Sequence, residues 1–583
     1  MHENSIIKDI RDGEEFMKVK SECTGKYDIT LLWNTDGVDL SESSHVKMWP
    51  VQAVICEVPY YLRPKFTFVC LVWIEHCKPK MNMYLKPFVK SLIDLWENGV
   101  DWTHPITKEK IVSKVVAPVL SADAPATADV LNIQDVTAIY GCNLCEQEAS
   151  PAPAIIKRKD RIVRRFTYHK ESAQLRTGER MKVQALNAKR MKKPYLGVKG
   201  RSVVRKIPLF DIGSSVPIDY MHCVLLGVVK RFTKLWFFVK SVVHERDWYI
   251  GDRLEDANKF ISDSVKVPDF VTREPRGLDV LDDWKASELL TWLLYHSLPV
   301  LIFLEMPTPY VKHHMLLVRA IFILLKDRIS EPDLDEAQRL VSRYVEQVGS
   351  LYRKQDLVYN VHSLLHLPLC VRRWGPLFAT SAFRFEDFNG TLASMVHGTK
   401  HQAKEFVTNL NLARGICGLK WKVEQSRCET ARGIVRLEKI RAASQDEMIP
   451  LRENNIVSVE VYDRCDYQGL TLTSRTYDEK VARANSFVLV RNSPVSLNPG
   501  QILIFFRMSD GVVFCTLEMF RLSYLEVLVN FTPPHLCRIE HLIPIDVNGK
   551  KEKLVCDLSS IAEKLVKAGN FVCRRPNKFE KNL

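Results

Sequence analysis

The sequence predicts a mixed α/β protein with more than one domain, and three observations support this fold class. Residues 28–132 follow the order strand, strand, strand, helix, strand, helix. Residues from about 219 to 370 have apolar positions at helical spacing, and after about 450 the chain shows the short alternating runs typical of strands. At 583 residues the chain is too long for a single hydrophobic core.

Each element of the N-terminal region has its own sequence signal. Extended apolar or alternating runs predict strands at 28–37, 48–58, 65–75 and 110–123. The first strand meets an aspartate just before a Gly turn, and the fourth ends on an aspartate. Apolar residues at helical spacing predict a helix over 81–99 with Gly99 as its stop signal, and residues 124–132 have the form of a helix start.

The later regions are predicted from longer patterns. Helical runs include MHCVLLGVVKRFTKLWFFVKSVV, ASELLTWLLYHSLPVLIFL, MLLVRAIFILLKDR and LDEAQRLVSRYVEQVGSLYRK. The longest apolar stretch, 289–304, is interrupted by His296 and Pro299 and is shorter than the roughly 20 residues that span a bilayer. We therefore expect buried helices there and no membrane association. Runs such as SFVLVRNS and GQILIFFRMSDGVVFCTLEMF predict a β-rich C-terminal part.

Composition indicates a soluble intracellular protein. The hydrophobic fraction of 46% and the charged fraction of 26% are ordinary for a globular chain, which excludes wholesale disorder. The fifteen cysteines are scattered and mostly lie in apolar runs, as reduced thiols do. The charged start, without an apolar h-region, predicts no signal peptide. A net charge of +14 favours an anionic partner such as nucleic acid or a membrane surface.

Three acidic residues are candidate catalytic groups: Asp36, Asp123 and Glu386. If the first and fourth strands are neighbours in the sheet, the two strand-end aspartates lie close together. Such carboxylates raise each other's pKa unless a cation neutralises them, and a set of two Asp and one Glu suits a pair of Mg²⁺ ions. The alternative is that strand-end aspartates only cap turns. Glu386 lies among aromatic residues in FRFEDFNG, where an unpaired charge is costly to bury.

Cysteine and histidine pairs form two candidate metal half-sites. Cys142 and Cys145 have CxxC spacing, and His362 and His366 are four residues apart on one helical face. Both spacings suit tetrahedral Zn²⁺, although a stray CxxC or a His pair packed in the core explains each half equally simply. The HSLLH stretch lacks the Glu of HExxH, which disfavours a zinc protease. Asp219 and His222 form either an oriented acid–His contact or a helix cap beside a core histidine.

Residues 157–206 form a basic segment with eighteen Lys or Arg against three acids. The segment has few aromatic residues, so it does not indicate base stacking on single strands. Phosphate contact, a nuclear import signal and a solvated linker face all remain open. The candidate DNA-contacting residues are Lys157, Arg158, Lys159, Arg161, Arg164, Arg165, Lys189, Arg190, Lys192 and Lys193.

Several motifs occur together in one order: NTDGV, WPVQAVICEVP, ADAPATADVLN, YGCNLC, IDYMHCVLLGVVKR and NVHSLLHLPLCVRRWGPLFATSAFRFEDFNG. Over roughly residues 5–420 the chain resembles the transposases of CACTA-type (En/Spm-like) DNA transposons, as found in animal transposase domain-containing proteins. The order of CxxC, paired His and final Glu also resembles the catalytic subunit of the V(D)J recombinase.

The resemblance implies a fold and a set of site residues. The fold is an RNase H-like catalytic core, interrupted by a large α-helical insertion and followed by a small β-rich C-terminal domain. The implied Mg²⁺ (or Mn²⁺) ligands are Asp36, Asp123 and Glu386, and the implied Zn²⁺ ligands are Cys142, Cys145, His362 and His366. The family's DxxH motif falls on Asp219 and His222.

We divide the chain into five expected parts. These are a first core part (1–150), a basic linker that contacts DNA (151–215), a helical insertion (216–370), a core completion with the Glu386 helix (371–450) and a β-rich domain (451–583). The expected function is metal-dependent cleavage and strand transfer of double-stranded DNA by a nuclear homodimer or larger assembly. The alternatives are a domesticated or decayed transposase that binds DNA or chromatin without catalysis, and a non-enzymatic helical scaffold.

Overall fold

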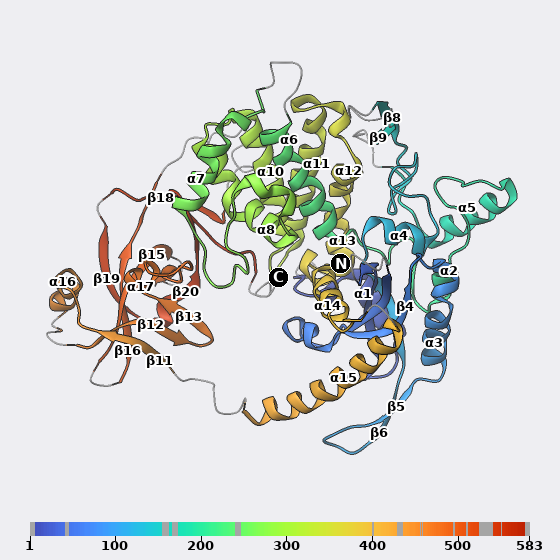
Figure 1. Ribbon diagram of the computed structural model, residues 1–583, viewed down its shortest axis with the longest axis horizontal. Coiled ribbons are helices and arrows are strands. Elements are labelled where there is room, and N and C mark those ends of the chain that lie inside the picture. Colours follow the sequence, from blue (N-terminus) through green and yellow to red (C-terminus); the bar gives the residue numbers. More distant parts are fainter. Residues whose placement is uncertain are drawn as a thin grey trace. The chain divides into compact units, whose positions relative to one another are not determined.

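The structure is a computed structural model that describes residues 6–40, 46–153, 162–165, 173–239, 247–398, 401–427, 435–454, 456, 459–493, 496–508, 511–523, 540–549 and 551–577. The chain divides into two compact units. The first joins Met1–Arg231 and Arg319–Gly415, and the second joins Phe232–Val318 and Ile416–Leu583. Both contain helices and strands, which confirms the predicted mixed α/β class (Figure 1).

The first unit is built around one mixed sheet with the strand order β4-β3-β1-β7. β1 pairs antiparallel with β3, β3 pairs antiparallel with β4, and β1 pairs parallel with β7. The strands are β1 (Ile29–Thr35), β3 (Lys47–Ile55), β4 (Phe68–Glu75) and β7 (Val115–Leu120), and the short β2 (Val38–Asp39) extends the pairing of β3. The first three predicted strands are confirmed, and the first and fourth are neighbours, as the site hypothesis requires.

The fourth predicted strand is two strands in the structure. β6 (Lys110–Ser113) pairs with β5 (Val100–Thr103) in a separate hairpin, and only β7 enters the central sheet. Burial explains the division, because all six residues of β7 are buried whereas β6 has two exposed positions. A strand covered on both faces requires a continuous apolar sequence, and VVAPVL is the part of the run that provides it.

One face of the sheet is covered by the helix predicted over 81–99. It is observed as α2 (Met81–Tyr84) and α3 (Lys86–Glu97), and Gly99 follows with a positive φ of 74°, as expected for a stop signal. Phe88 of α3 lies 5.1 Å from the ring of Trp33 in β1. α4 (Ala124–Leu131) and α5 (Gly178–Met191) contribute to the same buried cluster.

The opposite face is covered by α14 (Phe383–Ala393) and the start of α15 (Gln402–Arg427). Successive side chains of a strand alternate between faces, so Met48 and Gln52 of β3 share this face while Val51 points to the other. Met48 packs in a cluster with Leu392 and Phe406. The segment that carries Glu386 is therefore a helix seated directly on the central sheet.

The remaining elements of the first unit surround this sheet. Its other helices are η1 (Ile10–Asp12), α1 (Glu14–Glu22), η2 (Tyr60–Phe66), η3 (Val203–Lys206), η4 (Met221–Val229), α11 (Glu331–Leu351), η8 (Lys354–Asp356), α12 (Tyr359–Ser363), η9 (Leu364–His366), α13 (Leu367–Trp374) and η10 (Leu377–Thr380). A further hairpin consists of β8 (Ser150–Pro153) and β9 (Ile162–Arg165). η4 is a π-helix, a form that frequently marks functional positions.

The second unit combines helices with a β-rich region. Its helices are α7 (Leu254–Ser264), α8 (Ala286–Thr291), α9 (Ser297–Phe303), α16 (Gln445–Glu453), α17 (Arg475–Asp478) and the turns η5 (Gly251–Arg253), η6 (Leu278–Asp283), η7 (Trp292–His296) and η13 (Leu558–Ser560). α6 (Lys230–Phe238) and α10 (Thr308–Leu324) cross from one unit to the other. In the part of the chain that the structure describes, Ala286–Phe303 is long and apolar enough to cross a membrane, but 78% of it is buried, as in a core helix.

The predicted β-rich C-terminal region is confirmed. An eight-stranded sheet has the order β11-β12-β15-β14-β20, with β13 on β12 and β16 between β15 and β19. A five-stranded sheet has the order β10-β21-β22-β18-β17. The strands are β10 (Val265–Lys266), β11 (Arg436–Arg441), β12 (Val461–Tyr467), β13 (Leu470–Thr473), β14 (Phe487–Ser493), β15 (Ser496–Arg507), β16 (Val513–Met519), β17 (Arg521–Leu522), β18 (Leu542–Asp546), β19 (Glu552–Asp557), β20 (Ile561–Lys564), β21 (Val566–Ala568) and β22 (Phe571–Cys573).

Helices of the region expected as one insertion, 216–370, occur in both units. Met221–Val229 and the segment after Arg319 belong to the first unit, and Phe232–Val318 belongs to the second. The five-part division of the chain stays a prediction.

Candidate functional site

The pairing of β1 with β7 brings two of the predicted acids to the same edge of the sheet. Trp33 and Leu120 are aligned on these parallel strands, and Asp36 and Asp123 each lie three residues further on. Both aspartates also serve the local backbone. Asp36 accepts a hydrogen bond from the Gly37 N–H (2.7 Å), and Asp123 caps α4 by accepting from the Ala126 N–H (2.7 Å). Asp123 therefore caps α4, and the second carboxylate oxygen of each aspartate accepts no hydrogen bond from the residues that the structure describes.

Glu386 reaches this edge from α14. It lies in the first turn of the helix, with 45% of its side chain exposed, and its Oε1 is 3.0 Å from His222 Nε2. The neighbouring residue Phe385 is fully buried, whereas Asp387 is exposed. The buried Phe385 thus anchors the helix, while the half-exposed Glu386 contacts His222.

The pKa of Asp36 depends on its burial and on the charges of the other two acids. Burial, and after it the Asp123 carboxylate, are the main causes that raise the pKa of Asp36 to about 6. The Gly37 N–H and His222 oppose this shift, and Glu386 adds to it. A carboxyl group whose pKa is raised by two neighbouring carboxylates lies in a region of excess negative charge, which a cation relieves.

His222 connects this region to a buried aspartate. Its Nδ1 is 2.8 Å from Asp219 Oδ2, and its Nε2 contacts Glu386. Burial opposes protonation of His222, but hydrogen bonds to Asp219 and Glu386 raise its pKa to about 11. The histidine is therefore a cation at neutral pH, held between two carboxylates.

Asp219 has a second set of contacts with the backbone. Its Oδ2 accepts from the His222 N–H (3.0 Å), and its Oδ1 accepts from the N–H of Ala382 (2.9 Å), which precedes α14. The oriented acid–His contact and the cap-like contact, posed as alternatives from the sequence, both occur. A cavity of about 30 Å³, room for about one water, lies between Asp123, Asp219 and His222.

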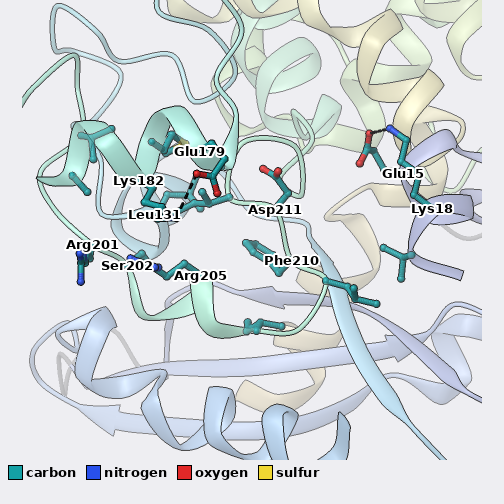
Figure 2. Close-up of a pocket in the computed structure, with 18 of the residues that line it drawn as sticks. Glu15, Lys18, Leu131, Glu179, Lys182, Arg201, Ser202, Arg205, Phe210 and Asp211 are labelled. Atoms are coloured by element: carbon teal, nitrogen blue, oxygen red, sulfur yellow. Dashed lines mark hydrogen bonds and ion pairs between the residues drawn. The ribbon is translucent and has the colours of Figure 1, made fainter. Parts of the chain in front are cut away.

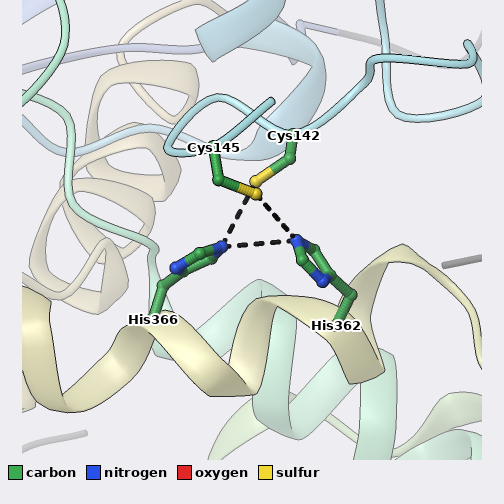
Figure 3. Close-up of side chains that lie close together, drawn as sticks. All are labelled: Cys142, Cys145, His362 and His366. Atoms are coloured by element: carbon green, nitrogen blue, oxygen red, sulfur yellow. Dashed lines mark hydrogen bonds between the residues drawn. The ribbon is translucent and has the colours of Figure 1, made fainter. Parts of the chain in front are cut away.

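The cysteine and histidine half-sites come together in one buried cluster (Figure 3). The loop that carries Cys142 and Cys145 faces the helical segment that carries His362 and His366. Cys142 Sγ lies 3.5 Å from His366 Nε2, Cys145 Sγ lies 3.3 Å from His362 Nε2, and the four ligand atoms lie within 4.8 Å of one another. Two sulfurs and two imidazole nitrogens at such distances suit a tetrahedral Zn²⁺ site.

The charge balance of this cluster also fits a cation. Burial alone raises the pKa of the Cys142 thiol, but the hydrogen bond with Cys145 and the nearby His366 and His362 lower it well below its usual value. A thiolate is the form of cysteine that binds metal. Four buried donors with one ionised thiol are therefore compatible with a closed structural metal site.

Arg176 supports the CxxC loop, although in the sequence it is only one of the eighteen Lys and Arg residues of the basic segment 157–206. It is 1% exposed, and its guanidinium donates to the carbonyls of Cys142 (2.9 Å) and Tyr140 (3.2 Å). The sequence offers no signal for this role, since the arginine lies about thirty residues beyond the loop in a segment full of lysines and arginines.

The basic segment is only partly described. Lys157, Arg158, Lys159 and Arg161 lie outside the described residues, and Arg164 and Arg165 belong to β9. Lys189 and Arg190 are in the last turn of α5, and Lys192 and Lys193 follow it, all four exposed to solvent. A cavity of about 540 Å³ lies nearby, between α1, α5 and residues 198–212 (Figure 2). Its rim carries Arg201 and Arg205 together with the ion pairs Lys18–Glu15 and Lys182–Glu179, and none of the predicted acids or Cys/His ligands line it.

The structure is an α/β protein in which Asp36 and Asp123 follow neighbouring parallel strands and four Cys and His residues form a separate buried cluster. A comparison with known families gives one match. Residues 12–205 match the transposase family tnp2. The matched third of the chain contains Asp36, Asp123, Cys142 and Cys145, and supports a transposase family, which acts on DNA in general. No curated protein matches the chain.

Proposed function

We propose that the chain is a DDE-type DNA transposase, or a transposon-derived protein that retains the same centre, and that it cleaves and joins DNA with bound metal ions. The convergence of Asp36, Asp123 and Glu386 at one edge of the sheet carries this proposal. The strand order supports an RNase H-like core, since three antiparallel strands are followed by a fourth parallel to the first. The CACTA type is the finer assignment that we propose.

The three carboxylates are the proposed ligands of Mg²⁺ or Mn²⁺. Burial is the main cause of the raised pKa of Asp36, and the part that Asp123 and Glu386 add to it supports this assignment, because a divalent cation neutralises their negative charge. When bound, a metal pair activates a water or a 3′ hydroxyl and stabilises the phosphate during in-line displacement, first at a transposon end and then at the target. Within the protein, His222 holds Glu386 in place, and Asp219 holds both His222 and the start of α14.

Zn²⁺ is the proposed occupant of the Cys142, Cys145, His362 and His366 cluster. Its role is structural, because all four residues are buried and no fifth direction remains open to substrate. The cluster joins the loop after α4 to the segment that precedes α14. Zinc would thus hold the Glu386 side of the site to the Asp123 side.

DNA contact is proposed for the exposed basic residues at the end of α5. Lys189, Arg190, Lys192 and Lys193 have no ion-pair partner among the described residues, so their charge is available to phosphates. Contacts of this kind predict an affinity that falls steeply with salt. We also propose that the protein is nuclear and that it acts as a homodimer that holds the two ends of the transposon together.

The decisive experiment is a nicking and strand-transfer assay on DNA taken from the genomic sequence on either side of the gene. We expect activity that requires Mg²⁺ or Mn²⁺ and that is lost in Glu386→Gln. Asp387→Asn is a matched control, because it removes the adjacent exposed charge on the same helix. Equal activity of wild type and Glu386→Gln contradicts the acid triad. A wild type that binds this DNA but does not cut it supports the domesticated or decayed alternative.

The scaffold alternative makes different predictions. It requires no zinc at stoichiometric amounts and no proximity of the three acids. The influence of Asp123, Glu386 and His222 on the pKa of Asp36, added to that of burial, argues against it, because it requires these groups to lie near one another.

A further inference from the structure

A row of polar side chains crosses the buried face of the central sheet beneath α14. It runs through Ser121, which follows β7, Asn34 of β1, Gln52 of β3 and Asn389 of α14. Their exposed fractions are 1%, 3%, 0% and 6%. Leu32, Met48 and Val54 are buried apolar residues of the same two central strands, so the row interrupts an otherwise apolar surface.

The row consists of two hydrogen-bonded groups that lie side by side on the sheet. Asn34 Nδ2 donates to the carbonyl of Ser121 (2.8 Å), and Asn34 and Gln52 are directly opposite each other on β1 and β3. Gln52 Nε2 donates to Asn389 Oδ1 and, at 3.4 Å, to the carbonyl of Phe385. Directional bonds therefore connect β3 to the glutamate-bearing helix, and another connects β1 to the segment after β7.

The register of the row matches that of the acids. Asn34 lies two residues before Asp36, and Ser121 lies two residues before Asp123. On α14, the two groups that Gln52 contacts lie on either side of Glu386, at Phe385 and Asn389. Each of the three acids therefore lies within three residues of a side chain or carbonyl that takes part in the row.

The row contains three buried acceptors that accept no hydrogen bond from any described residue: Asn34 Oδ1, Gln52 Oε1 and Ser121 Oγ. An unpaired buried acceptor costs free energy, whereas two apolar residues of similar shape are close to neutral at such a position. The directional contacts of the row are therefore what an apolar pair would lack.

We propose that Gln52 is a positioning residue that fixes α14 on the sheet, while Asn34 holds the end of β1 to the segment after β7, and that together they set Glu386 at its working distance from Asp36 and Asp123. This inference rests on the proposed function. Apolar contacts are not directional, so an apolar interface allows small sliding of a helix that an amide hydrogen bond prevents. Misplacement of a catalytic group by about 1 Å lowers a rate by about a hundredfold.

Gln52→Leu tests the proposal, because it removes the donors and the unpartnered acceptor at similar side-chain volume. Because Gln52→Leu leaves the buried Asn389 Oδ1 without its donor, we expect a lower thermal midpoint without metal, which the double variant Gln52→Leu/Asn389→Leu should recover. We also expect a fall in the cleavage rate of about tenfold or more with the KM for DNA nearly unchanged. We expect Gln52→Leu also to need a higher Mn²⁺ concentration than wild type for half-maximal binding, as measured by calorimetry without DNA.

Two further variants separate positioning from simple packing. Met48→Leu changes the volume of an apolar neighbour on the same face and is expected to retain rate and Mn²⁺ affinity. Asn389→Leu removes the acceptor on α14, and the double variant with Gln52→Leu is expected to lose no more activity than Gln52→Leu alone, since one contact is removed in both.

The outcomes distinguish this inference from the proposed function. A wild type that neither binds Mn²⁺ nor cleaves DNA overturns both. A functional wild type with an equally active Gln52→Leu of unchanged Mn²⁺ affinity overturns the positioning role alone. A parallel fall of thermal midpoint and rate in Gln52→Leu and Met48→Leu also overturns it, because the row is then only part of the core.

Discussion

The carboxylate centre and the Cys/His cluster lie in the same unit, and each is assembled from distant parts of the chain, yet they are opposite in character. Cys142, Cys145, His362 and His366 are all buried, and their donor atoms face one another. At the carboxylate centre, by contrast, Glu386 has 45% of its side chain exposed, and the acids raise the pKa of Asp36.

This difference teaches how one unit accommodates two kinds of metal site. A closed set of four donors leaves no position for substrate and stabilises the fold. An open set of like charges is destabilising without a cation and leaves room for substrate and solvent. We therefore expect changes in the cluster to act on folding, and changes in the carboxylate centre to act on chemistry.

The largest expected effect is the loss of the Cys/His cluster. Structural Zn²⁺ contributes on the order of 10 kcal/mol of apparent binding free energy in small domains, so Cys142→Ser or strong chelation should unfold much of the first unit. Metal analysis and thermal unfolding measure this, and Cys77→Ser, which changes an exposed thiol, is the control. If the purified wild type contains no zinc and is no more stable than Cys142→Ser, the cluster is not a structural zinc site and the contrast between the two centres is wrong.

The next effect concerns Asp123, which has both a capping and a proposed catalytic role. Asparagine is as good an N-cap as aspartate, so Asp123→Asn should keep stability within about 0.5 kcal/mol, while Asp123→Ala loses about 1 kcal/mol of unfolding free energy. Both variants should lose at least about a hundredfold in metal-dependent cleavage. Denaturant unfolding and cleavage rates separate the two roles, and a fully active Asp123→Asn contradicts the second.

The third effect is a pH dependence of stability without metal. Because the pKa of Asp36 is raised from 3.8 to about 6 in the folded protein, its contribution is fully present below about pH 4 and is lost as pH rises to about 6. A shift of this size corresponds to at most about 3 kcal/mol, less after allowance for partial exposure. The difference in unfolding free energy between wild type and Asp36→Asn measures it, and saturating Mg²⁺ should remove it. A pH-independent difference contradicts the prediction.

The smallest effect concerns His222. Its cationic imidazole lowers the pKa of Asp36 and holds Glu386, so His222→Gln should raise the pKa of Asp36 further and reduce cleavage by about tenfold, a change of about 1.4 kcal/mol. Carboxyl titration by NMR measures the first change. His397→Gln, at an exposed histidine beyond α14, is the control. An unchanged Asp36 titration in His222→Gln shows that the two groups do not interact in solution.

Much of the first unit was predictable because its signals are local. Strand-forming runs around Trp33, Val51 and Val72 have strong β propensity, and their order along the chain predicted three of the four sheet strands with small errors at the ends. The adjacency of Asp36 and Asp123 followed from a hypothesis about strand order rather than from either residue alone. The CxxC and HxxxH spacings likewise identified the two halves of the cluster. The spacings alone did not predict that the two halves lie together in the fold.

Other features had no local signal. The division of 110–123 into β6 and β7 depends on which residues the rest of the protein covers. Arg176 and Gln52 are ordinary polar residues in sequence, and only their burial against the CxxC loop and α14 reveals what they hold.

The sequence by itself determined the elements, the chemistry of the acids and thiols, and the segments on which they lie, because propensity, periodicity and ligand type are properties of neighbouring residues. Tertiary structure alone decided which charged groups act on the pKa of Asp36 and which side chains are buried from water. It also decided that the Gln52 amide connects the sheet to α14. Those properties depend on distances between residues hundreds of positions apart, such as Gln52 and Asn389, and long-range packing is what sets them.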